Sequence, residues 1–390
     1  MAIIDCMDSR PLRIGLAGFG AMGKVHTFAV KNLSLYYDPM PFSATIIGIC
    51  TTSPQKSKQI ARQHGFSRYY ESINDMIADP TLDIIDICTP NSSHYEIICK
   101  ALDAGKHVLC EKPLCLTLDE ASDLVGREKK SGKTCGMVFN NRFMAPIQRA
   151  NQLIREGRIG KLLTYQVSYL HNSSVFADRA PGWKQTAAGG GGVLADLGSH
   201  IIDLIAMMCG PFDRVQALSQ IGIAHHANWE TDAEEAFYIL AKMKNGACGT
   251  ITASKLAIGT NDDLNLEIYG DKGSLRYHLM EPNWLYFYDG TRPDSPIGGE
   301  CGFTRIACGG HYPSPGGSFP SPKAAVGWTR CHVESMYRFL SSVATNSPFS
   351  PSLQEGAYVQ AVMQAARESA ATGKEQEVKV PWDCSPDFPI

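Results

Sequence analysis

The sequence predicts an α/β protein with two domains. We expect a doubly wound parallel sheet in residues 1–140 and an α/β domain with an open, mixed, mostly antiparallel sheet in residues 141–390. Three observations support this. Apolar runs alternate with helical patterns through the first 140 residues, and a glycine-rich turn joins the first run to the first helix. Beyond residue 157, strand patterns instead follow one another across turn signals.

The N-terminal elements are expected in regular alternation. Ser92 or Ser93 should cap the helix over 93–105, and Gly105 should end it. Strands that alternate with helices form parallel units. The predicted strands are 44–50, 83–90, 106–113 and 133–140, preceded by a first strand that runs into the glycine turn over 13–20; the helices after 83–90 and 106–113 are 93–105 and 118–132.

The C-terminal half begins with a helix near 145–157 and then changes to hairpin patterns. The stretch 291–328 is rich in Gly, Pro and Ser, so we expect it to be irregular and either functional or disordered. The predicted hairpins are 235–255, around an Asn-Gly turn, and 264–279, and the last two helices are 329–345 and 353–372.

Composition narrows the class of protein. The net charge is −3 and no basic block occurs, so nucleic acid is not an expected partner. No uncharged apolar run reaches the roughly 18 residues of a membrane span, and the N-terminus lacks a signal-peptide pattern. The 13 cysteines are scattered, which predicts reduced thiols and a cytoplasmic protein. Neither H-E-x-x-H nor C-x-x-C occurs, so we expect no metal site.

A dinucleotide site is predicted where the first strand meets the first helix. There Gly18, Gly20 and Gly23 form G-x-G-x-x-G, which permits a tight turn, close approach of a pyrophosphate and close packing of helix on strand. The second strand ends in Thr51 and Thr52 without a carboxylate or an arginine. Their hydroxyls suit a ribose diol or, with Lys56, a 2′-phosphate, so the cofactor is NAD or NADP, and we favour NADP.

One helical stretch carries polar residues in an apolar run. In "GGGGVLADLGSHIIDL" (189–204), Asp196, His200 and Asp203 are four and three residues apart, which places them on one helix face at about 100° per residue. Two carboxylates and an imidazole on one face are not what an ordinary buried helix carries.

Several motifs together resemble the Gfo/Idh/MocA (glucose–fructose oxidoreductase/inositol dehydrogenase/rhizopine catabolism) family. They are the glycine turn, "TPNSSH" (89–94), "AGKHVLCEKP" (104–113), "NNRF" (140–143) and "GGGVLADLGSHIIDL" (190–204). The resemblance implies a Rossmann domain, a second domain whose sheet forms a homo-oligomer (dimer or tetramer), and hydride transfer between NAD(P) and a secondary alcohol of a sugar, glycoside or cyclitol.

The resemblance also implies roles for residues. Lys112 would reach the substrate and the nicotinamide ribose, Asp196 would bind substrate hydroxyls, and His200 would be the general acid/base; these three are the catalytic candidates. Glu111 would position Lys112. The cofactor-binding candidates are Gly18, Phe19, Gly20, Ala21, Met22, Gly23, Thr51, Thr52, Thr89, Pro90, Asn91, His94, Glu111, Lys112 and Asn140, and the substrate-binding candidates are Lys112, Arg142, Trp183, Asp196, His200 and His311.

Some roles stay open. Arg142 could clamp a substrate oxygen or bridge the domains, Asp203 could assist the site or form a structural ion pair, and Trp183 could stack on a sugar or pack in the core. The glycines at 189–192 would let the backbone approach the sugar. Residues 309–340 resemble levoglucosan dehydrogenase-type members and related glycoside 3-dehydrogenases, in which His311, Tyr312 and Trp328 would frame the sugar.

Three functions are therefore considered. The first is an NAD(P)-dependent dehydrogenase that acts on a sugar or glycoside, at C3 if the subgroup resemblance holds. The second is a glycoside-cleaving enzyme that oxidises C3 transiently and eliminates the aglycone. The third is a sugar- or dinucleotide-sensing regulator, which the presence of Lys112 and His200 disfavours. The sequence leaves open the sugar, the direction of reaction and the oligomeric state.

Overall fold

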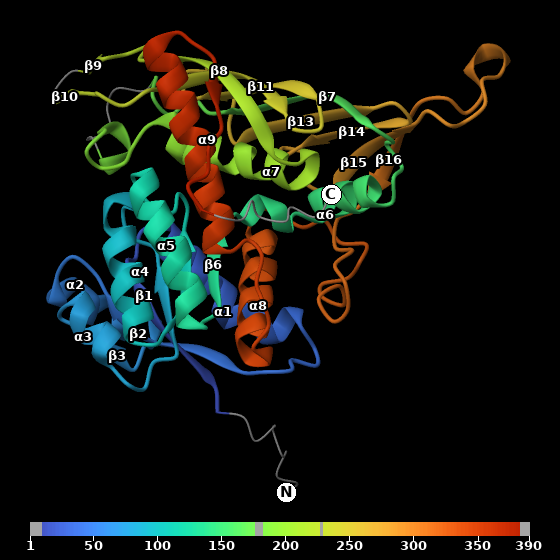
Figure 1. Cartoon of the computed structure of the whole chain (residues 1–390). Coiled ribbons are helices and arrows are strands. Elements are labelled where there is room, and N and C mark those ends of the chain that lie inside the picture. The colour runs from blue at the N-terminus through green and yellow to red at the C-terminus, as the bar shows by residue number, and fades with distance from the viewer. Residues whose placement is uncertain (1–9, 176–181, 227–228, 383–390) are drawn as a thin grey trace, which may run out of the picture.

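The computed structural model describes residues 10–175, 182–226 and 229–382. Two sheets dominate it, one in each half of the chain (Figure 1). The N-terminal elements form the lower half of Figure 1, and the larger sheet lies above them.

The N-terminal sheet has six parallel strands in the order β3-β2-β1-β4-β5-β6, which confirms the predicted doubly wound fold. The order reverses between β1 and β4, and ligands of such sheets bind beside the strands' carboxyl ends at this switch point. The strands are β1 (Leu12–Ala17), β2 (Ala44–Cys50), β3 (Arg68–Tyr69), β4 (Ile84–Ile87), β5 (His107–Glu111) and β6 (Cys135–Val138). The helices are α1 (Ala21–Tyr36), α2 (Pro54–His64), α3 (Ile73–Ala78), α4 (His94–Asp103) and α5 (Leu118–Ser131).

Local chemistry explains where these helices begin and end. A capping box between Thr117 and Glu120 starts α5, and Gly132, at φ 61°, ends it in the left-handed conformation. The helix expected from residue 93 begins at His94, because the 3-10 turn Asn91–Ser93 comes first and Ser93 makes no side-chain cap.

The second sheet has nine strands in the order β16-β15-β14-β13-β7-β12-β11-β8-β17. Only the neighbours β7 and β12 are parallel within it, so the predicted mixed, mostly antiparallel sheet is confirmed. Its strands are β7 (Leu162–Leu170), β8 (Phe212–Gln220), β11 (Ala236–Met243), β12 (Cys248–Ser254), β13 (Asp263–Gly270), β14 (Gly273–His278), β15 (Trp284–Asp289), β16 (Phe303–Ala307) and β17 (Gln376–Glu377), and β9 (His225–His226) pairs with β10 (Trp229–Glu230) beside it.

The expectation of an irregular stretch over 291–328 is wrong for part of it. Residues 303–307 form β16, which pairs with β15 in a hairpin whose connection projects from the molecule (Figure 1). Trp284 lies opposite Ala307, and the Arg305 guanidinium stacks over the Trp284 ring at 3.9 Å. Cross-strand contacts therefore stabilise a strand here, although the surrounding Gly and Pro residues favoured the prediction of an irregular segment.

Four further helices belong to the C-terminal half: α6 (Ala145–Arg155), α7 (Ser199–Cys209), α8 (Thr329–Thr345) and α9 (Leu353–Thr372). Helix α8 packs against α1 of the first half, where Tyr337 stacks on Tyr37 at 3.6 Å and Glu334 accepts a hydrogen bond from the Tyr37 hydroxyl. Helix α9 packs between α5 and β8. The end of the chain therefore holds the two halves together, as Figure 1 shows.

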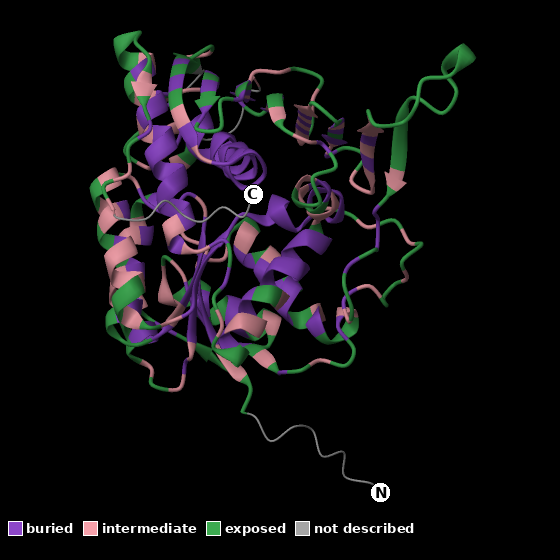
Figure 2. Ribbon diagram, turned by 45° about the vertical axis from the view of Figure 1, so that its right-hand side comes forward, coloured by how far each residue is buried: buried purple, intermediate pink, exposed green. Residues whose placement is uncertain are grey.

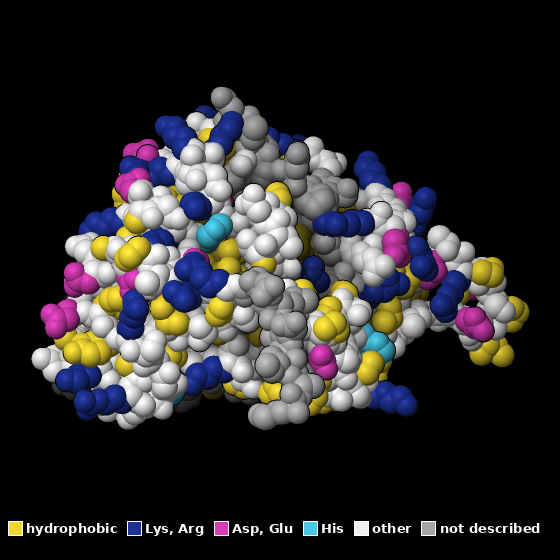
Figure 3. Space-filling model, turned by 90° about the horizontal axis from the view of Figure 1, so that it is seen from below, with side chains coloured by type: hydrophobic (Ala, Val, Ile, Leu, Met, Phe, Trp, Pro, Cys, Tyr) yellow, Lys and Arg dark blue, Asp and Glu magenta, His cyan; other side chains and the backbone are white. Residues whose placement is uncertain are grey.

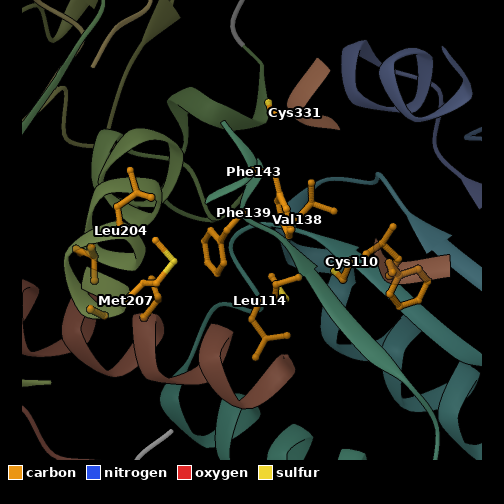
Figure 4. Packing of buried hydrophobic residues seen from close by; sticks show 14 of the residues in the cluster. Cys110, Leu114, Val138, Phe139, Phe143, Leu204, Met207 and Cys331 are labelled. Carbon is orange, nitrogen blue, oxygen red and sulfur yellow. The ribbon is translucent and has the colours of Figure 1, made fainter. Parts of the chain in front are cut away.

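The apolar core continues across the junction. Phe139, just after β6, lies between Leu204 and Met207 of α7 and the residues Leu114 and Val138 of the first half (Figure 4). Helix α7 is buried along its whole length, and Figure 2 shows it in purple near the centre. Burial on all sides fixes the direction of each α7 side chain, including His200.

The described helices include none that is long and apolar enough to cross a membrane. Lysine and arginine side chains are scattered among other residue types on the face shown in Figure 3. The surface seen there has no single basic block of the kind expected of a nucleic-acid-binding protein.

Candidate active site

A cavity of about 660 Å³ lies where the carboxyl ends of β1, β2, β4 and β5 meet. It collects residues that follow all four strands, as expected at the switch point of such a sheet. The sequence-predicted cofactor residues that line it are Gly18, Phe19, Gly20, Ala21, Met22, Thr51, Thr52, Thr89, Pro90, Asn91, Glu111 and Lys112; Lys56, Trp183, Lys184 and Asp196 also line it.

The three glycines of the turn each meet a different requirement. Gly18 has φ +91°, and a Cβ there would lie 2.5 Å from the Cys88 carbonyl oxygen. A Cβ on Gly23 would lie 2.5 Å from the Gly18 carbonyl oxygen, so α1 can pack closely on the turn. A Cβ on Gly20 would meet nothing within 4 Å. Gly20 thus leaves open space at the N-terminus of α1, which fits a dinucleotide pyrophosphate.

Hydroxyl groups occupy the end of β2. The Thr51 backbone N–H donates to the Ser57 hydroxyl at 2.9 Å, and the Thr51 hydroxyl lies 3.0 Å from the same oxygen. Thr51, Thr52 and Lys56 all border the cavity. The donor set fits an adenosine ribose, so the described residues can hold a nicotinamide dinucleotide along the whole cavity.

His94, which the sequence predicts to bind the cofactor, does not line this cavity and instead connects two loops. Its Nδ1 lies 2.8 Å from the Pro113 carbonyl oxygen and its Nε2 3.0 Å from that of Thr89. It therefore ties the ends of β4 and β5 together. Asn91 also makes a structural contact, because its amide donates to the Gly190 carbonyl oxygen at 2.8 Å.

A second cavity, of about 410 Å³, adjoins the first. The two share Met22, Glu111, Lys112, Lys184 and Asp196, so one end of the dinucleotide cavity is also a wall of this one. The remaining lining comes mainly from the C-terminal half: Asn140, Tyr169, His171, Ser173, Ser174, Gln185, Leu197, His200, Trp229, Lys255, Asp262 and Trp328.

Asp196 is the centre of charge in this second cavity. Its Oδ1 lies 3.0 Å from the Lys112 ammonium and 2.8 Å from that of Lys184, and its Oδ2 lies 3.0 Å from the Lys255 ammonium. Lys112 also donates to the Asp196 carbonyl oxygen at 2.6 Å. One buried carboxylate therefore gathers three ammonium groups.

These contacts shift the pKa values in opposite directions. Burial alone would raise the pKa of Asp196, but the three ammonium groups outweigh it and hold that pKa well below the usual carboxyl range. Burial lowers the pKa of Lys112, and Asp196 opposes the change. Asp196 therefore stays ionised, and it keeps Lys112 in place as a charged donor.

His200 lies in the same cavity with one free ring nitrogen. Its Nδ1 is buried and has no hydrogen-bond partner among the described residues, and its ring packs against Phe139 and Tyr169. Burial lowers the pKa of His200 well below 6.5, and the Lys112 ammonium lowers it further. The imidazole is therefore neutral at physiological pH and can accept a proton.

Asp203 does not line the cavity that Asp196 and His200 share, so the expectation that it assists the site is not supported. A wide π-helical turn over Leu194–Gly198 precedes α7, and Asp203 lies one turn beyond His200 in that helix. Asp203 instead accepts two hydrogen bonds from the Arg142 guanidinium, which also donates to Glu355 of α9 at 2.6 Å.

Arg142 consequently lies outside the second cavity. Its side chain is buried and its donors are occupied by Asp203, Glu355 and the Ser350 hydroxyl. It lines neither cavity, so the substrate-clamping alternative is not supported. The geometry is that of the other alternative, a bridge that ties α7 and α9 to the end of the first domain.

The glycines at 189–192 do not face a sugar. A Cβ on Gly189 would lie 2.6 Å from the Trp183 carbonyl oxygen, and one on Gly191 would lie 2.4 Å from that of Lys184. The run thus lets the chain pack on its own 3-10 turn, Trp183–Gln185. This packing directs Lys184 toward Asp196 and places Trp183 beside the dinucleotide cavity.

A buried ionic network that contains His26 and Asp86 holds the Glu111 side chain in place. The His26 ring bonds Asp86 through Nδ1, at 2.9 Å, and Glu111 through Nε2, at 3.2 Å. Burial lowers the pKa of His26, but Asp86 and Cys88 outweigh it and raise that pKa well above 6.5. Glu111 in turn accepts from the Lys112 backbone N–H at 3.2 Å, as expected of a residue that positions Lys112.

The ligand atoms of His26, Asp86 and Cys88 lie within 4.8 Å of one another, which is the one grouping among the described residues with metal-site spacing. Hydrogen bonds from the His26 ring to Asp86 account for this closeness. The grouping therefore carries no metal assignment.

The sequence reasoning missed several residues of the second cavity, chiefly Lys255, Tyr169, His171 and Asp262. Lys255 and His171 follow the parallel neighbours β12 and β7 directly, as Lys112 follows β5. The sequence signal that could have identified Lys255 and His171 is a charged or titratable residue directly after a predicted strand. His311 and Tyr312 border a separate surface hollow, whereas Trp328 does line the cavity.

Comparison with known proteins gives the family. Residues 12–139 match "Oxidoreductase family, NAD-binding Rossmann fold", and residues 147–276 match "GFO/IDH/MocA C-terminal domain". Levoglucosan dehydrogenase of Pseudarthrobacter phenanthrenivorans is 28% identical over 95% of this chain and 98% of its own. D-glucoside 3-dehydrogenase of Escherichia coli is 25% identical over 69% of this chain and 77% of its own.

Solved structures agree with the sequence comparisons. The structure of levoglucosan dehydrogenase in complex with NADH and levoglucosan superposes with a TM-score of 0.90, at 28% identity over 95% of this chain and all of that one. Together with the six-stranded parallel sheet and the open glycine turn, these matches show that the chain belongs to the Gfo/Idh/MocA family of NAD-binding oxidoreductases.

Proposed function

We propose that this protein is an NAD(P)-dependent dehydrogenase that transfers hydride between the nicotinamide and a secondary alcohol, at C3, of a sugar, glycoside or cyclitol. The observation that carries the proposal is the meeting of Lys112, Asp196 and His200 in a cavity that adjoins the dinucleotide cavity. Relatives named as levoglucosan dehydrogenase and D-glucoside 3-dehydrogenase support the substrate class and the position.

The residues divide the chemistry between them. The bound nicotinamide would supply the hydride acceptor. His200, which is neutral and lines the second cavity, takes the hydroxyl proton as the ketone forms, and returns it in the reverse reaction. Lys112 donates to the reacting oxygen and stabilises its developing negative charge. Asp196 holds Lys112 in place and orients the sugar.

The test is a cofactor and turnover assay on the purified chain. The protein is denatured to identify any released dinucleotide, and the absorbance of reduced nicotinamide is followed with NAD⁺ and NADP⁺ across glucose, glucosides, anhydrosugars and inositols. Reduction of added cofactor is expected. Aglycone release without reduced cofactor would favour the glycoside-cleaving alternative, and binding without any turnover would favour the regulator.

Two substitutions test the assigned roles. Lys112→Met and His200→Ala should each lower turnover by about 10²–10⁴-fold, the usual contribution of a positioned proton-transfer group, while the dinucleotide still binds. Lys379→Met, at a lysine with 78% of its side chain exposed, is the matched control and should leave turnover unchanged. Loss of dinucleotide binding in the first two variants would contradict the assignment.

For the cofactor, we propose a preference for NADP over NAD. The hydroxyls of Thr51 and Thr52 and the Lys56 ammonium border the adenosine end and no carboxylate follows β2 directly, which supports a 2′-phosphate. Thr51→Asp should shift the ratio of kcat/KM values toward NAD by repelling that phosphate. An unchanged ratio would contradict the placement of the ribose.

We also propose a homo-oligomer in a reducing cytoplasm. The eleven cysteines among the described residues are free thiols, which supports the compartment. Apolar side chains on the outer face of the nine-stranded sheet support the assembly, because Leu218 and Leu240 are 68% and 59% exposed there.

A further inference from the structure

The surroundings of Asp196 contain more positive charge than the carboxylate can balance. Lys112, Lys184 and Lys255 all make their ion pair with this one group, at 2.8–3.0 Å. Lys255 is the least accessible, with 6% of its side chain exposed. A buried ammonium that shares a single counter-charge with two others is costly unless a further anion joins it.

The other acidic side chains along the cavity are already engaged. Glu111 is paired with the charged His26 at 3.2 Å. Asp262 accepts from the Tyr169 hydroxyl at 2.6 Å and lies 2.9 Å from His171 Nε2. Across the described lining the three ammonium groups are equal in number to the carboxylates Glu111, Asp196 and Asp262, but among these only Asp196 forms an ion pair with the lysines, so three ammonium groups meet one carboxylate there.

Hydrogen-bond donors are in surplus as well. An ammonium has three N–H donors, and the only acceptor that Lys255 or Lys184 contacts among the described residues is Asp196. Both oxygens of Asp196 already face ammonium groups, so the N–H donors of the three lysines outnumber the acceptors that this carboxylate supplies. The cavity wall therefore presents donors and positive charge, and a ligand that supplies acceptors and negative charge fits it.

The cofactor does not account for Lys255. Lys112 and Lys184 border both cavities and could lie near the dinucleotide, whereas Lys255 borders only the second one. It follows β12 directly, beside the parallel strand β7, and belongs to the part of the second cavity's lining that comes from the nine-stranded sheet. The charge of Lys255 is thus available to a substrate even when the dinucleotide is bound.

We infer that the substrate is an anionic sugar, whose carboxylate or phosphate group binds Lys255 and Lys184 while Lys112 and His200 face the reacting hydroxyl. The inference rests on the proposed function and narrows its substrate class. A charge-assisted contact of this kind distinguishes sugars that are otherwise identical, and it weakens as salt is added.

The test compares D-glucose, D-glucuronate and D-glucose 6-phosphate, which differ at C6 in their anionic group. Each is titrated by calorimetry into the full chain saturated with NADPH, and the titration is repeated with NADH. At least one anion should bind about tenfold or more tightly than glucose, as expected for a hydrogen bond between charged groups, with the advantage reduced in high salt. Tighter binding of glucuronate would identify a carboxylate, and tighter binding of glucose 6-phosphate a phosphate.

The variant Lys255→Met should bring the ratio of anion affinity to glucose affinity close to one, and the glucose affinity of the same variant is the reference for this ratio. Lys379→Met should change neither affinity. Glucose that binds as tightly as both anions to the wild type would overturn the inference and leave the dehydrogenase proposal intact. If none of the three binds and no sugar is turned over, the proposed function itself fails.

Discussion

At the scale of single residues, burial decides the chemistry of His200. Its ring packs against Phe139 and Tyr169, and the Lys112 ammonium lies close enough to oppose a second positive charge. An ordinary histidine would be half protonated at pH 6.5, whereas this one stays neutral there. The same burial lowers the pKa of Lys112 below 10.5.

The pH profile of kcat/KM for alcohol oxidation follows from these two shifts. Because the base must be unprotonated, the rate should stay level as the pH falls through 6.5 and decline only below it. On the alkaline side, loss of the Lys112 proton should lower the rate before pH 10.5. An acid midpoint at or above 6.5 would contradict a buried, neutral His200.

The lowered pKa of His200 also makes the stability of the folded chain depend on pH. The unfolded chain binds a proton at His200 near pH 6.5 and the folded chain does not, so the free energy of unfolding should fall as the pH drops below 6.5.

Arg142 carries a different prediction, because its partners make it structural. Arg142→Met would leave Asp203 and Glu355 buried without their cation, which costs about 3–5 kcal/mol. The urea midpoint should fall accordingly, while the sugar KM of the folded enzyme stays the same. Arg149→Met, in a partly exposed pair with Glu156, is the control and should cost only about 0–1 kcal/mol. A raised KM with unchanged stability would restore the clamping role of Arg142.

At the scale of elements, the turn between β1 and α1 contains one glycine that the fold requires and another that the ligand requires. Gly18→Ala should cost about 1–3 kcal/mol or more, since φ +91° disfavours any side chain and Cys88 leaves no room for one. Gly20→Val should leave the melting temperature nearly unchanged, because its Cβ meets nothing, yet it should abolish dinucleotide binding. Unimpaired binding by the second variant would place the pyrophosphate elsewhere.

Elements and motifs differed in how far the sequence could predict them. The parallel sheet followed from the alternation of apolar runs with helical patterns, whereas Lys112 was nominated by the resemblance of its Glu-Lys-Pro motif to the family. Strand β16 followed from neither signal, because its stability comes from pairing with β15 and from the contact of Arg305 with Trp284. The structural role of Asp203 could not be predicted, because its partner Arg142 and the Glu355 that shares this arginine are far from it in the sequence.

The lysines around Asp196 show the same limit within the site. Lys184 and Lys255 are far from Lys112 in the sequence, and only the packing of the glycine run and the parallel pairing of β7 with β12 bring them together. Sequence reasoning could nominate charged residues at strand ends, but it could not rank them without the topology of the second sheet.

At the scale of the whole molecule, the open face of the nine-stranded sheet predicts assembly. Leu218 lies opposite Tyr238 on the neighbouring strand, and Leu240 is on the same face, all of them exposed in the single chain. The wild type should therefore be a dimer or tetramer by light scattering. Leu218→Lys combined with Leu240→Glu should shift it to smaller species without unfolding it, and a wild type that is already monomeric would contradict this.

The wall shared by the two cavities has a consequence for the order of events. Lys112, Lys184 and Asp196 border both spaces, so a ligand in one fixes side chains that the other must use. Occupancy of the two is then coupled, and thermodynamic reciprocity requires that each ligand change the affinity for the other by the same factor. A dinucleotide that binds first would order these side chains, so that the sugar meets a preformed binding surface. A sugar that binds first would itself have to order them.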